Sequence, residues 1–390
     1  MSYDFDKIYD RRGTGCIKWS RNPYNHPDMI PLGIADMDLA TPDFVIEGMT
    51  ERLKHPILGY FRPDERFFHS IINWHRDQFG VENLNAEEIV YQHSVLGGLA
   101  TALDIFSRPG DSVILQTPAY FNFAQILNAH QRNVVTNSLK WKDGMYHLDL
   151  EDFEKKIVEN QVKAAIICSP HNPTGRVWTR EELEGVVEIC WKHQVKIIAD
   201  EIWSDLVLDG THTPLHTVSE KAREITVSLY SPTKTFNMAG LVIGYAVIFN
   251  EDIRRAFQEQ SDLSHYNNCN LLSVEALIAA YDKGREWKEA VCSYLGENTR
   301  LVRDFVEEKL PLIQIGPVQG TYLVWLDFSQ TDLNSDQIME LSGTEGLYFN
   351  DGRTCVADGD RCLRMNAAIP RPVLAKALER MEKAFGVHCR

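Results

Sequence analysis

Positive charge is scarce in this sequence. Forty Lys and Arg residues stand against 55 Asp and Glu residues, which gives a formal net charge of −15. A chain this acidic binds polyanions poorly, so nucleic acids and anionic membranes are not expected partners. Long apolar runs are also missing: stretches such as residues 241–249 are far shorter than the roughly 18 residues of a membrane-spanning helix. The N-terminal MSYDFDKIYDRRG has no apolar core, so no secretory signal peptide is expected.

Cysteine is sparse as well. Eight cysteines in 390 residues are too few for a disulfide scaffold, and no two form a C-x-x-C pair. Cys168 and Cys190 lie in apolar segments and are predicted to be buried packing residues. No His or Cys pair has the spacing of a known zinc site, so no metal is expected. Together with the missing signal peptide, these features predict a protein of the reducing cytoplasm.

The chain does contain a regular alternation of strands and helices. Apolar residues make up 44% and charged residues 24%, which excludes wholesale disorder, and the length suggests two or three domains. A helix over about residues 179–193 begins with a capping box of Thr179 and Glu182. Short apolar strands spaced by helices predict a mostly parallel sheet covered on both faces. The expected strands are residues 88–92, 112–116, 164–168, 196–199, 225–229 and 241–249.

The last hundred residues have a different pattern. A long helical stretch is expected over residues 273–308, followed by a strand at 320–327, a helix near Ser335, a strand at 362–366 and a helix from Pro372. This order predicts a smaller α+β domain. We therefore expect an α/β large domain over residues 50–285, and a small domain formed by both chain ends, residues 1–49 and 286–390.

Polar groups follow five of the expected strands. Because ligands of open α/β sheets bind outside the carboxyl ends of the strands, these groups are expected to share one edge of the sheet. Together they offer phosphate-binding, aromatic, amide, acidic and amine groups. The five segments are His93-Ser-Val-Leu-Gly-Gly98, Thr117-Pro-Ala-Tyr120, Ser169-Pro-His-Asn-Pro-Thr-Gly175, Asp200-Glu-Ile-Trp203 and Tyr230-Ser-Pro-Thr-Lys234.

Each segment alone also has an ordinary structural explanation. Residues 94–98 could form only a tight strand-to-helix turn, or their backbone N–H groups could cradle a phosphate. Tyr120 could be a packing aromatic, Asp200 a helix cap and Lys234 a solvated lysine. Residues 172–175 could be a plain turn. Only the combination of all five segments points to a site.

That combination resembles the fold-type-I pyridoxal-phosphate enzymes, the aspartate-aminotransferase superfamily, over nearly the whole chain. The markers, in the order and spacing of that superfamily, are Asn172-Pro-Thr-Gly175, Asp200-Glu201, Ser231-Pro-Thr-Lys234 and Arg364-Met-Asn366. The resemblance implies a large domain with a mostly parallel seven-stranded sheet flanked by helices, and a smaller α+β domain. It also implies pyridoxal 5'-phosphate as the cofactor.

The resemblance assigns roles to single residues. Lys234 matches the lysine whose amine holds the cofactor aldehyde and later removes the α-proton of the substrate. Asp200 matches the carboxylate that keeps the cofactor ring nitrogen protonated. The other expected cofactor contacts are Asn172 at the phenolic oxygen, Tyr120 stacked on the ring, Val95, Leu96 and Ser231 at the phosphate, and Trp203 three residues after the aspartate.

Substrate and partner contacts follow from the same resemblance. Arg364 matches the arginine that grips the substrate α-carboxylate, a bidentate task that lysine performs poorly. Tyr60 matches a tyrosine that reaches the phosphate of the neighbouring subunit, which implies a homodimer with shared active sites. The other expected substrate contacts are Gly33, Ile34, Asn172 and Tyr120.

Three features single out one branch of the superfamily. Many aminotransferases of this class carry an arginine eight residues after the lysine, where this chain has Val242. Two N-terminal segments, Arg12-Gly-Thr-Gly-Cys-Ile-Lys-Trp19 and Ile34-Ala-Asp-Met-Asp38, resemble signatures of the PatB/MalY-type carbon–sulfur β-lyases, although the second alone could be a polar loop. Residues 234–240 and 320–327 resemble the same branch.

Two positions depart from that branch. Trp203 stands where the branch usually has His, or where aminotransferases have Tyr. Tryptophan offers one N–H donor and no acceptor, which affects the hydrogen bond to the cofactor's phenolic oxygen. Gly33 stands where a bulky aromatic residue is common, which is expected to enlarge or reshape the substrate pocket.

The expected reaction is an α,β-elimination. An L-cysteine-type amino acid would bind through its carboxylate to Arg364, lose its α-proton to Lys234, and then lose a thiolate that Tyr120 could protonate. The remainder would hydrolyse to pyruvate and ammonia. Cystathionine would yield homocysteine, and cysteine would yield hydrogen sulfide.

Two alternative functions share these residues. An aminotransferase would follow the same steps through proton removal, but it would need a 2-oxo acid acceptor and would release no ammonia. A cofactor-binding transcription regulator would need an additional DNA-binding domain. The first fifty residues are too short and not basic enough to form such a domain ahead of the fold.

Overall fold

A seven-stranded mixed sheet forms the centre of the fold, and the computed structural model describes residues 3–389. In spatial order its strands are β2 (Ile89–Gln92), β10 (Gly244–Val247), β9 (Thr226–Tyr230), β8 (Lys196–Asp200), β7 (Ala164–Cys168), β3 (Ser112–Thr117) and β4 (Asn133–Ser138). Only β10 runs antiparallel to its neighbours among these seven strands. The expected mostly parallel seven-stranded sheet is therefore confirmed.

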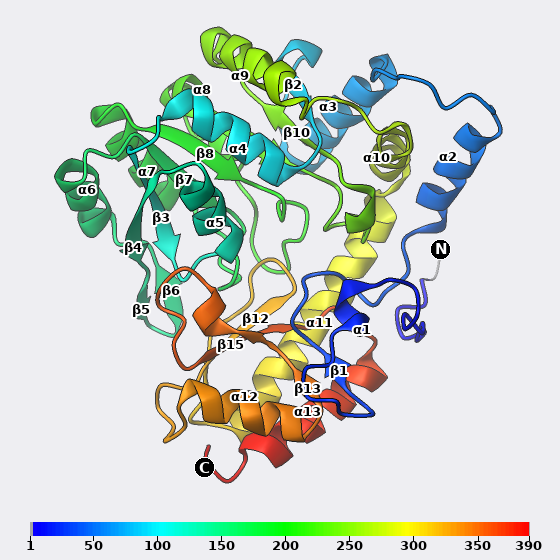
Figure 1. Cartoon of the computed structure of the whole chain (residues 1–390), viewed down its shortest axis with the longest axis vertical. Helices are drawn as coiled ribbons and strands as arrows, with labels where there is room; N and C mark the ends of the chain where they lie inside the picture. Colours follow the sequence, from blue (N-terminus) through cyan, green and yellow to red (C-terminus); the bar gives the residue numbers. More distant parts are fainter. Residues whose placement is uncertain (1–2, 390) are drawn as a thin grey trace.

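Helices cover both faces of this sheet (Figure 1). One face packs against α4 (Val95–Phe106), α5 (Phe121–Ala129) and α9 (Glu251–Ser264). The other face packs against α6 (Leu150–Glu159), α7 (Arg180–Lys192) and α8 (Glu220–Ile225). Side chains of a pleated strand alternate between faces, so Ile166 joins the first cluster and Ile167 the second. Two-sided burial explains why the strands are continuous apolar runs.

Local sequence signals behave as predicted in this domain. At the start of α7, the Thr179 side chain accepts a hydrogen bond from the Glu182 N–H, and the Glu182 carboxylate accepts one from the Thr179 N–H. The predicted capping box is thus confirmed. Cys168 and Cys190 are buried in the clusters on opposite faces of the sheet, also as predicted.

A further group of helices packs beside the large sheet. It comprises α2 (Asp43–Leu53), α3 (Glu65–Phe79), α10 (Leu271–Lys283) and the long α11 (Arg285–Lys309). The helical stretch expected over residues 273–308 is broken at Gly284, where α10 ends and α11 begins. A Cβ atom on Gly284 would lie 2.1 Å from the Ala280 carbonyl oxygen and 2.3 Å from the Phe236 ring. Only glycine fits this close approach, which depends on a residue distant in sequence.

A second, antiparallel sheet organises the C-terminal part of the chain. Its strands are β11 (Gln314–Ile315), β12 (Leu323–Asp327), β15 (Cys362–Asn366) and β14 (Asn350–Asp351), accompanied by α12 (Ser335–Thr344) and α13 (Arg371–Phe385). The N-terminal β1 (Ile30–Pro31) pairs with β13 (Leu347–Tyr348), so the N-terminal segment joins the C-terminal part of the chain in the lower half of Figure 1. We propose that the two domains meet between residues 49 and 50 and between residues 285 and 286, as predicted from the sequence. Helix α2 spans the first of these boundaries.

Other strands differ from the expected bounds. The strand expected at 241–249 is only the four-residue β10, because η3 (Ala239–Leu241) precedes it and Val242 has a φ of +46°. A β-branched residue rarely adopts this left-handed conformation, and a residue in this conformation cannot continue a strand. The strands β4, β5 (Lys140–Lys142) and β6 (Met145–His147) were not predicted, since polar residues break the apolar pattern in β4 and β5 and β6 has only three residues. Short elements complete the chain: α1 (Ile17–Ser20), η1 (Ala86–Glu88), η2 (Leu215–Thr217) and η4 (Gly352–Thr354).

Three general features bear on function. No helix within residues 3–389 is both long and apolar enough to cross a membrane. In the same part of the chain, His, Cys, Asp and Glu side chains form no group of three or more that could hold a metal ion. All eight cysteines are free thiols.

Candidate active site

A cavity of about 180 Å³ lies at the carboxyl ends of β7, β8 and β9. Parallel strands bring their carboxyl ends to one edge, which is where open α/β sheets bind ligands. Eight of the predicted site residues line this cavity: Val95, Leu96, Tyr120, Asn172, Asp200, Trp203, Ser231 and Lys234. The other lining residues are Ala35, Ser94, Ile202, Thr233, Ala239, Val242 and Ile243.

Lys234 supplies the amine of this cavity. Burial, and next the nearby Arg364 guanidinium, lower the pKa of Lys234 to about 8. Its Nζ donates a hydrogen bond to the Ala35 carbonyl oxygen at 2.7 Å. An amine whose pKa lies near neutrality can serve as a nucleophile or a base.

Asp200 supplies the acid. It ends β8 and is buried, and its Oδ1 accepts a hydrogen bond from the Ile202 N–H at 3.2 Å. Burial raises the pKa of Asp200 to about 6 because the charged form is poorly solvated. A buried carboxylate of this kind suits a cationic partner, such as a protonated ring nitrogen.

Arg364 reaches the site from β15 of the second sheet. Its side chain is buried, Nη1 donates to Asn172 Oδ1 at 3.1 Å, and Nη2 donates to the Gly33 carbonyl oxygen at 2.9 Å. Its buried Nε–H finds no hydrogen-bond acceptor among residues 3–389. A buried guanidinium with an unsatisfied donor fits an anionic ligand such as a carboxylate.

The start of α4 forms the anion-binding side of the cavity. Ser94 caps the helix and accepts a hydrogen bond from the Gly97 N–H at 3.0 Å. The N–H groups of Val95 and Leu96 belong to the first turn, where helix geometry leaves donors without intrahelical partners. Gly244 packs so closely that a Cβ atom there would lie 3.0 Å from the Val95 nitrogen. These N–H groups can hold a phosphate, and their contact with the cofactor phosphate stays a prediction.

Ser231 and Tyr120 complete the predicted contacts. Ser231 Oγ donates to the Ile243 carbonyl oxygen at 2.6 Å, so its proton is directed away from an anion in this conformation. Tyr120 lines the cavity, and its hydroxyl accepts a hydrogen bond from Asn122 Nδ2 at 2.7 Å. Burial raises the pKa of Tyr120, so the phenol stays protonated. Amine, carboxylate, aromatic ring and helix N-terminus together fit pyridoxal phosphate.

Trp203 presents an aromatic surface to the cavity. Its ring is buried, packs edge-to-face on Tyr322 with 4.8 Å between centroids, and lies 5.3 Å from Lys234 Nζ. This geometry allows a cation–π interaction with the Lys234 ammonium. Trp203 therefore forms a wall beside the reactive amine.

Besides Arg364, three predicted residues do not line this cavity. Gly33 and Ile34 line a second cavity of about 460 Å³. A Cβ atom on Gly33 would lie 3.1 Å from the Asn350 backbone nitrogen, so the glycine serves a close backbone approach and any larger side chain would have to displace that backbone. Tyr60 is fully exposed and lines a different cavity, together with Arg62. Its contact with a neighbouring subunit stays a prediction.

Four residues with clear contacts were given no role by the sequence: Ala35, Asn237, Tyr322 and Asn366. The Ala35 carbonyl accepts from both Lys234 Nζ and the Tyr322 hydroxyl, the latter at 3.0 Å. The Asn237 and Asn366 amides bind backbone groups of residues 34–39. All four lie in segments that carry the superfamily resemblance, which was the only available signal.

Comparisons with known proteins agree with this geometry. The family described as aminotransferase class I and II matches residues 27–381. The chain is 34% identical over 387 residues to cystathionine beta-lyase PatB of Bacillus subtilis, covering 98% of this chain and 100% of PatB. Cystalysin from Treponema denticola, which contains pyridoxal 5'-phosphate, has a TM-score of 0.94 at 31% identity and 99% coverage of both chains. The pyridoxal-phosphate-bound C–S lyase of Staphylococcus hominis has a TM-score of 0.90 at 30% identity and 98% coverage of both chains.

Proposed function

This chain belongs to the aminotransferase class I and II family, and we propose that it is a pyridoxal-phosphate-dependent carbon–sulfur β-lyase. It cleaves cystathionine or related cysteine thioethers to a thiol, pyruvate and ammonia. One observation carries the proposal: Lys234 and Asp200 share one cavity in a chain that is similar over its full length to a cystathionine β-lyase.

The residues of the site divide the work of the elimination. Pyridoxal phosphate, when bound, withdraws electrons from the α-carbon of the amino acid and makes its proton removable. Lys234 takes that proton, because a pKa of about 8 leaves part of its population neutral near pH 7. Arg364 holds the α-carboxylate through its unsatisfied Nε–H. Asp200 holds the positive charge on the ring nitrogen.

Tyr120 is the proposed proton donor for the departing sulfur. Its phenol stays protonated, because burial raises its pKa, and it lines the same cavity as Lys234. The buried rings of Trp203 and Tyr322 exclude water beside the amine. A site closed in this way favours proton transfer between fixed groups over exchange with solvent.

Quaternary structure and location are the finer parts of the proposal. We propose a homodimer in which Tyr60 reaches the phosphate site of the partner subunit. Exposed apolar side chains at Ile57 and Leu58, next to the fully exposed Tyr60, support it. A cytoplasmic location agrees with eight free thiols, which persist in a reducing compartment.

The second cavity is the proposed place for the part of the substrate beyond the sulfur. Residues that line the two cavities are neighbours in the chain: Ile34 precedes Ala35, and Phe121 follows Tyr120. Its walls include the aromatic residues Phe121, Tyr348 and Phe349, and the exposed Arg21 contributes a cation. The part of cystathionine beyond the sulfur is a short methylene chain that ends in an α-amino acid group, and its carboxylate would face the Arg21 cation.

Thiol release from two thioethers tests the function and this cavity together. Without any 2-oxo acid, the holoenzyme should release equal amounts of thiol and pyruvate from L-cystathionine and from S-methyl-L-cysteine. Arg21→Gln should lower kcat/KM for cystathionine by about 3- to 10-fold, because one exposed charged contact is lost. The same variant should leave S-methyl-L-cysteine, which has no distal carboxylate, within about 2-fold.

Arg12→Gln is the matched control, since Arg12 is an exposed arginine that pairs with Asp10 on the same N-terminal segment. Arg12→Gln should leave kcat/KM unchanged for both substrates. Absence of thiol from both substrates would contradict the lyase function. If Arg21→Gln lowers kcat/KM equally for both substrates, only the role of the second cavity would be contradicted.

A further inference from the structure

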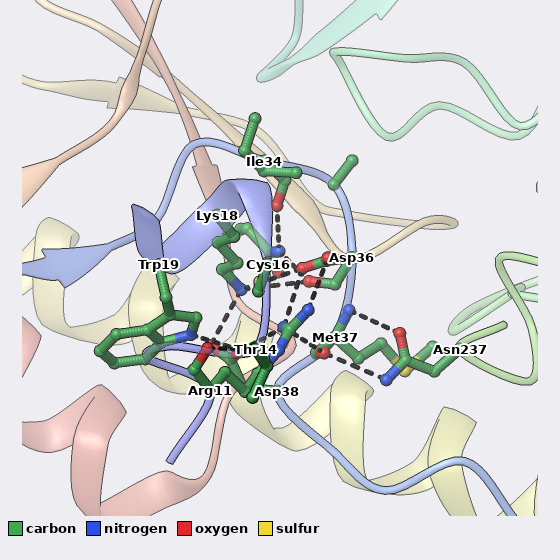
Figure 2. Close-up of polar contacts among 12 residues, drawn as sticks. Arg11, Thr14, Cys16, Lys18, Trp19, Ile34, Asp36, Met37, Asp38 and Asn237 are labelled. Carbon is green, nitrogen blue, oxygen red and sulfur yellow. Dashed lines mark hydrogen bonds and ion pairs between the residues drawn. The ribbon is translucent and has the colours of Figure 1, made fainter. Parts of the chain in front are cut away.

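A cluster of charged side chains, drawn in Figure 2, consists of residues that do not line the cavity. Lys18 is completely buried, with Nζ 3.0 Å from Asp38 Oδ2. Arg11 bridges both acids, with Nη1 2.6 Å from Asp38 Oδ1 and Nη2 2.8 Å from Asp36 Oδ2. The Trp19 Nε1–H donates to Asp38 Oδ1 at 2.9 Å. Two cations, two anions and one indole thus meet in a single network.

Stability alone does not account for such a network. Desolvation of buried ions cancels most of their attraction, so a buried ion pair adds little net stability compared with apolar packing. Burial alone would raise the pKa of Asp38, but Lys18, Trp19 and Arg11 outweigh burial and hold that pKa below its usual value. The carboxylate therefore stays charged, and the arrangement fixes geometry.

The segment that carries the two acids touches the active site directly. We call residues 33–38 the strap. The Gly33 carbonyl accepts a hydrogen bond from Arg364 Nη2 at 2.9 Å, and the Ala35 carbonyl accepts one from Lys234 Nζ at 2.7 Å. One side of the strap thus contacts the two residues that bind the substrate carboxylate and supply the amine.

The same segment is held at its other positions. Lys18 Nζ also donates to the Asp36 carbonyl oxygen at 3.1 Å, and Arg11 Nη1 donates to the Met37 carbonyl oxygen at 3.0 Å. Figure 2 shows Asn237 on the far side of Met37, where its Oδ1 accepts from the Met37 N–H at 3.0 Å. Every residue of the strap from 36 to 38 is therefore fixed by side chains from other segments.

We propose that Arg11, Lys18, Trp19, Asp36 and Asp38 form a clamp that positions the strap for amino-acid binding. Through the strap, the clamp aligns Arg364 with the substrate carboxylate and holds the Lys234 amine in place between turnovers. These are positioning residues, since none of the five lines the Lys234 cavity. The clamp depends on the proposed function in one respect only, namely that the ligand of the site is an amino acid.

The clamp also explains why two separate N-terminal segments mark this chain. Residues 12–19 contribute Lys18 and Trp19, and residues 34–38 contribute both acids. Lys18 and Trp19 of the first segment both bind Asp38 of the second, so the network joins the two. The pair of signatures is thus one structural device.

Ligand binding by holoenzyme variants tests the clamp. Arg11→Gln is the main variant, because Arg11 is the most accessible cation of the network, with 24% of its side chain exposed. The probe is L-alanine, which has no leaving group on its β-carbon, titrated by the visible absorbance of the bound cofactor. Its Kd should rise about 10- to 100-fold, because Arg364 is misaligned. Arg11→Lys keeps the charge but loses the forked contact, and its Kd should fall between those of the wild type and Arg11→Gln.

Two further readouts separate positioning from general damage. Hydrogen exchange should accelerate in residues 33–39 and stay unchanged in β8. With L-cystathionine, KM should rise by a factor similar to the alanine Kd, while kcat changes less than about 3-fold. Asp10→Asn, which breaks the exposed pair of Asp10 with Arg12 on the same segment, should change none of these values.

Several outcomes would overturn the clamp. An unchanged alanine Kd with faster exchange in the strap would show that strap order does not govern binding. A variant that fails to fold, while Arg11→Lys folds and binds alanine like the wild type, would assign the network to stability. If alanine binding changes as expected but no thiol is ever released from cystathionine, the clamp stands and the proposed lyase function fails.

Discussion

Replacing Lys234 by alanine should lower turnover of L-cystathionine by at least about 10³-fold, because the residue both holds the cofactor and moves the α-proton. The visible absorbance of cofactor bound to the wild-type protein should be lost or displaced at the same time. The amine is in a position for both roles, since it lies in the cavity with Asp200 and has a pKa of about 8. Steady-state kinetics and absorbance spectra of the purified variant measure the two effects.

A lysine elsewhere on the surface provides the control. Lys54 has 69% of its side chain exposed, and within residues 3–389 its ion pair is with Glu51. Lys54→Ala should keep wild-type kinetics and absorbance. Turnover near the wild-type rate in Lys234→Ala would mean that another group removes the proton, and the account of this site would be wrong.

Replacing Asp200 by asparagine should have two effects of opposite sign. Activity should fall by about 10²- to 10³-fold, as for removal of one fixed electrostatic contact to the reacting group. Stability of the cofactor-free protein should rise, because burial raises the pKa of Asp200 from 3.8 to about 6. Above pH 6 the buried Asp200 is a poorly solvated carboxylate, which destabilises the folded protein. Asparagine is neutral and removes this destabilisation.

The sign of the stability effect depends on pH. A carboxyl whose folded pKa lies above its unfolded pKa loses stability as pH rises through the folded value. The gain in Asp200→Asn should therefore reach up to about 3 kcal/mol at pH 8, from roughly two pKa units at 1.36 kcal/mol each. It should fall to about 0.5 kcal/mol near pH 4, where the unfolded carboxyl with its pKa of 3.8 is already partly ionised, and vanish below about pH 3, where both states carry a protonated acid.

Urea unfolding of the cofactor-free proteins at pH 8 and pH 4 measures this difference. Asp143→Asn is the control, since Asp143 has 82% of its side chain exposed and a φ of +52°, which asparagine tolerates. That variant should show no gain at either pH. A gain of equal size at both pH values would exclude ionisation of Asp200 as the cause.

The sequence was sufficient to predict the positions of residues that lie at a strand end or at the start of a helix and whose side chains have a recognisable chemistry. Asp200 and Lys234 follow apolar strands, and a parallel sheet brings such positions to one edge whatever the distant packing does. The capping box at Thr179 is equally local. The capping box needed only neighbours in the chain, whereas the site of Asp200 and Lys234 was predicted from five segments together and from the superfamily resemblance.

Contacts made by backbone atoms could not be read in this way. The Ala35 carbonyl holds Lys234 although alanine has no polar side chain, and Gly33 accepts from Arg364 through its carbonyl. Gly33 was expected to change the substrate pocket, which stays a prediction, and the structure shows in addition that it allows a close approach to Asn350. The break at Gly284 similarly depends on the Phe236 ring. Each of these outcomes is set by tertiary packing between segments far apart in sequence.

Following the amino nitrogen tests the central claim most directly. The holoenzyme would be given S-methyl-L-cysteine labelled with ¹⁵N, together with an equal amount of a 2-oxo acid, and the label would be followed by NMR. A β-lyase places the ¹⁵N in ammonium, in an amount equal to the methanethiol and pyruvate formed, whether or not the 2-oxo acid is present. Label in the amino acid derived from the 2-oxo acid, with no thiol released, would contradict the account and make this protein an aminotransferase.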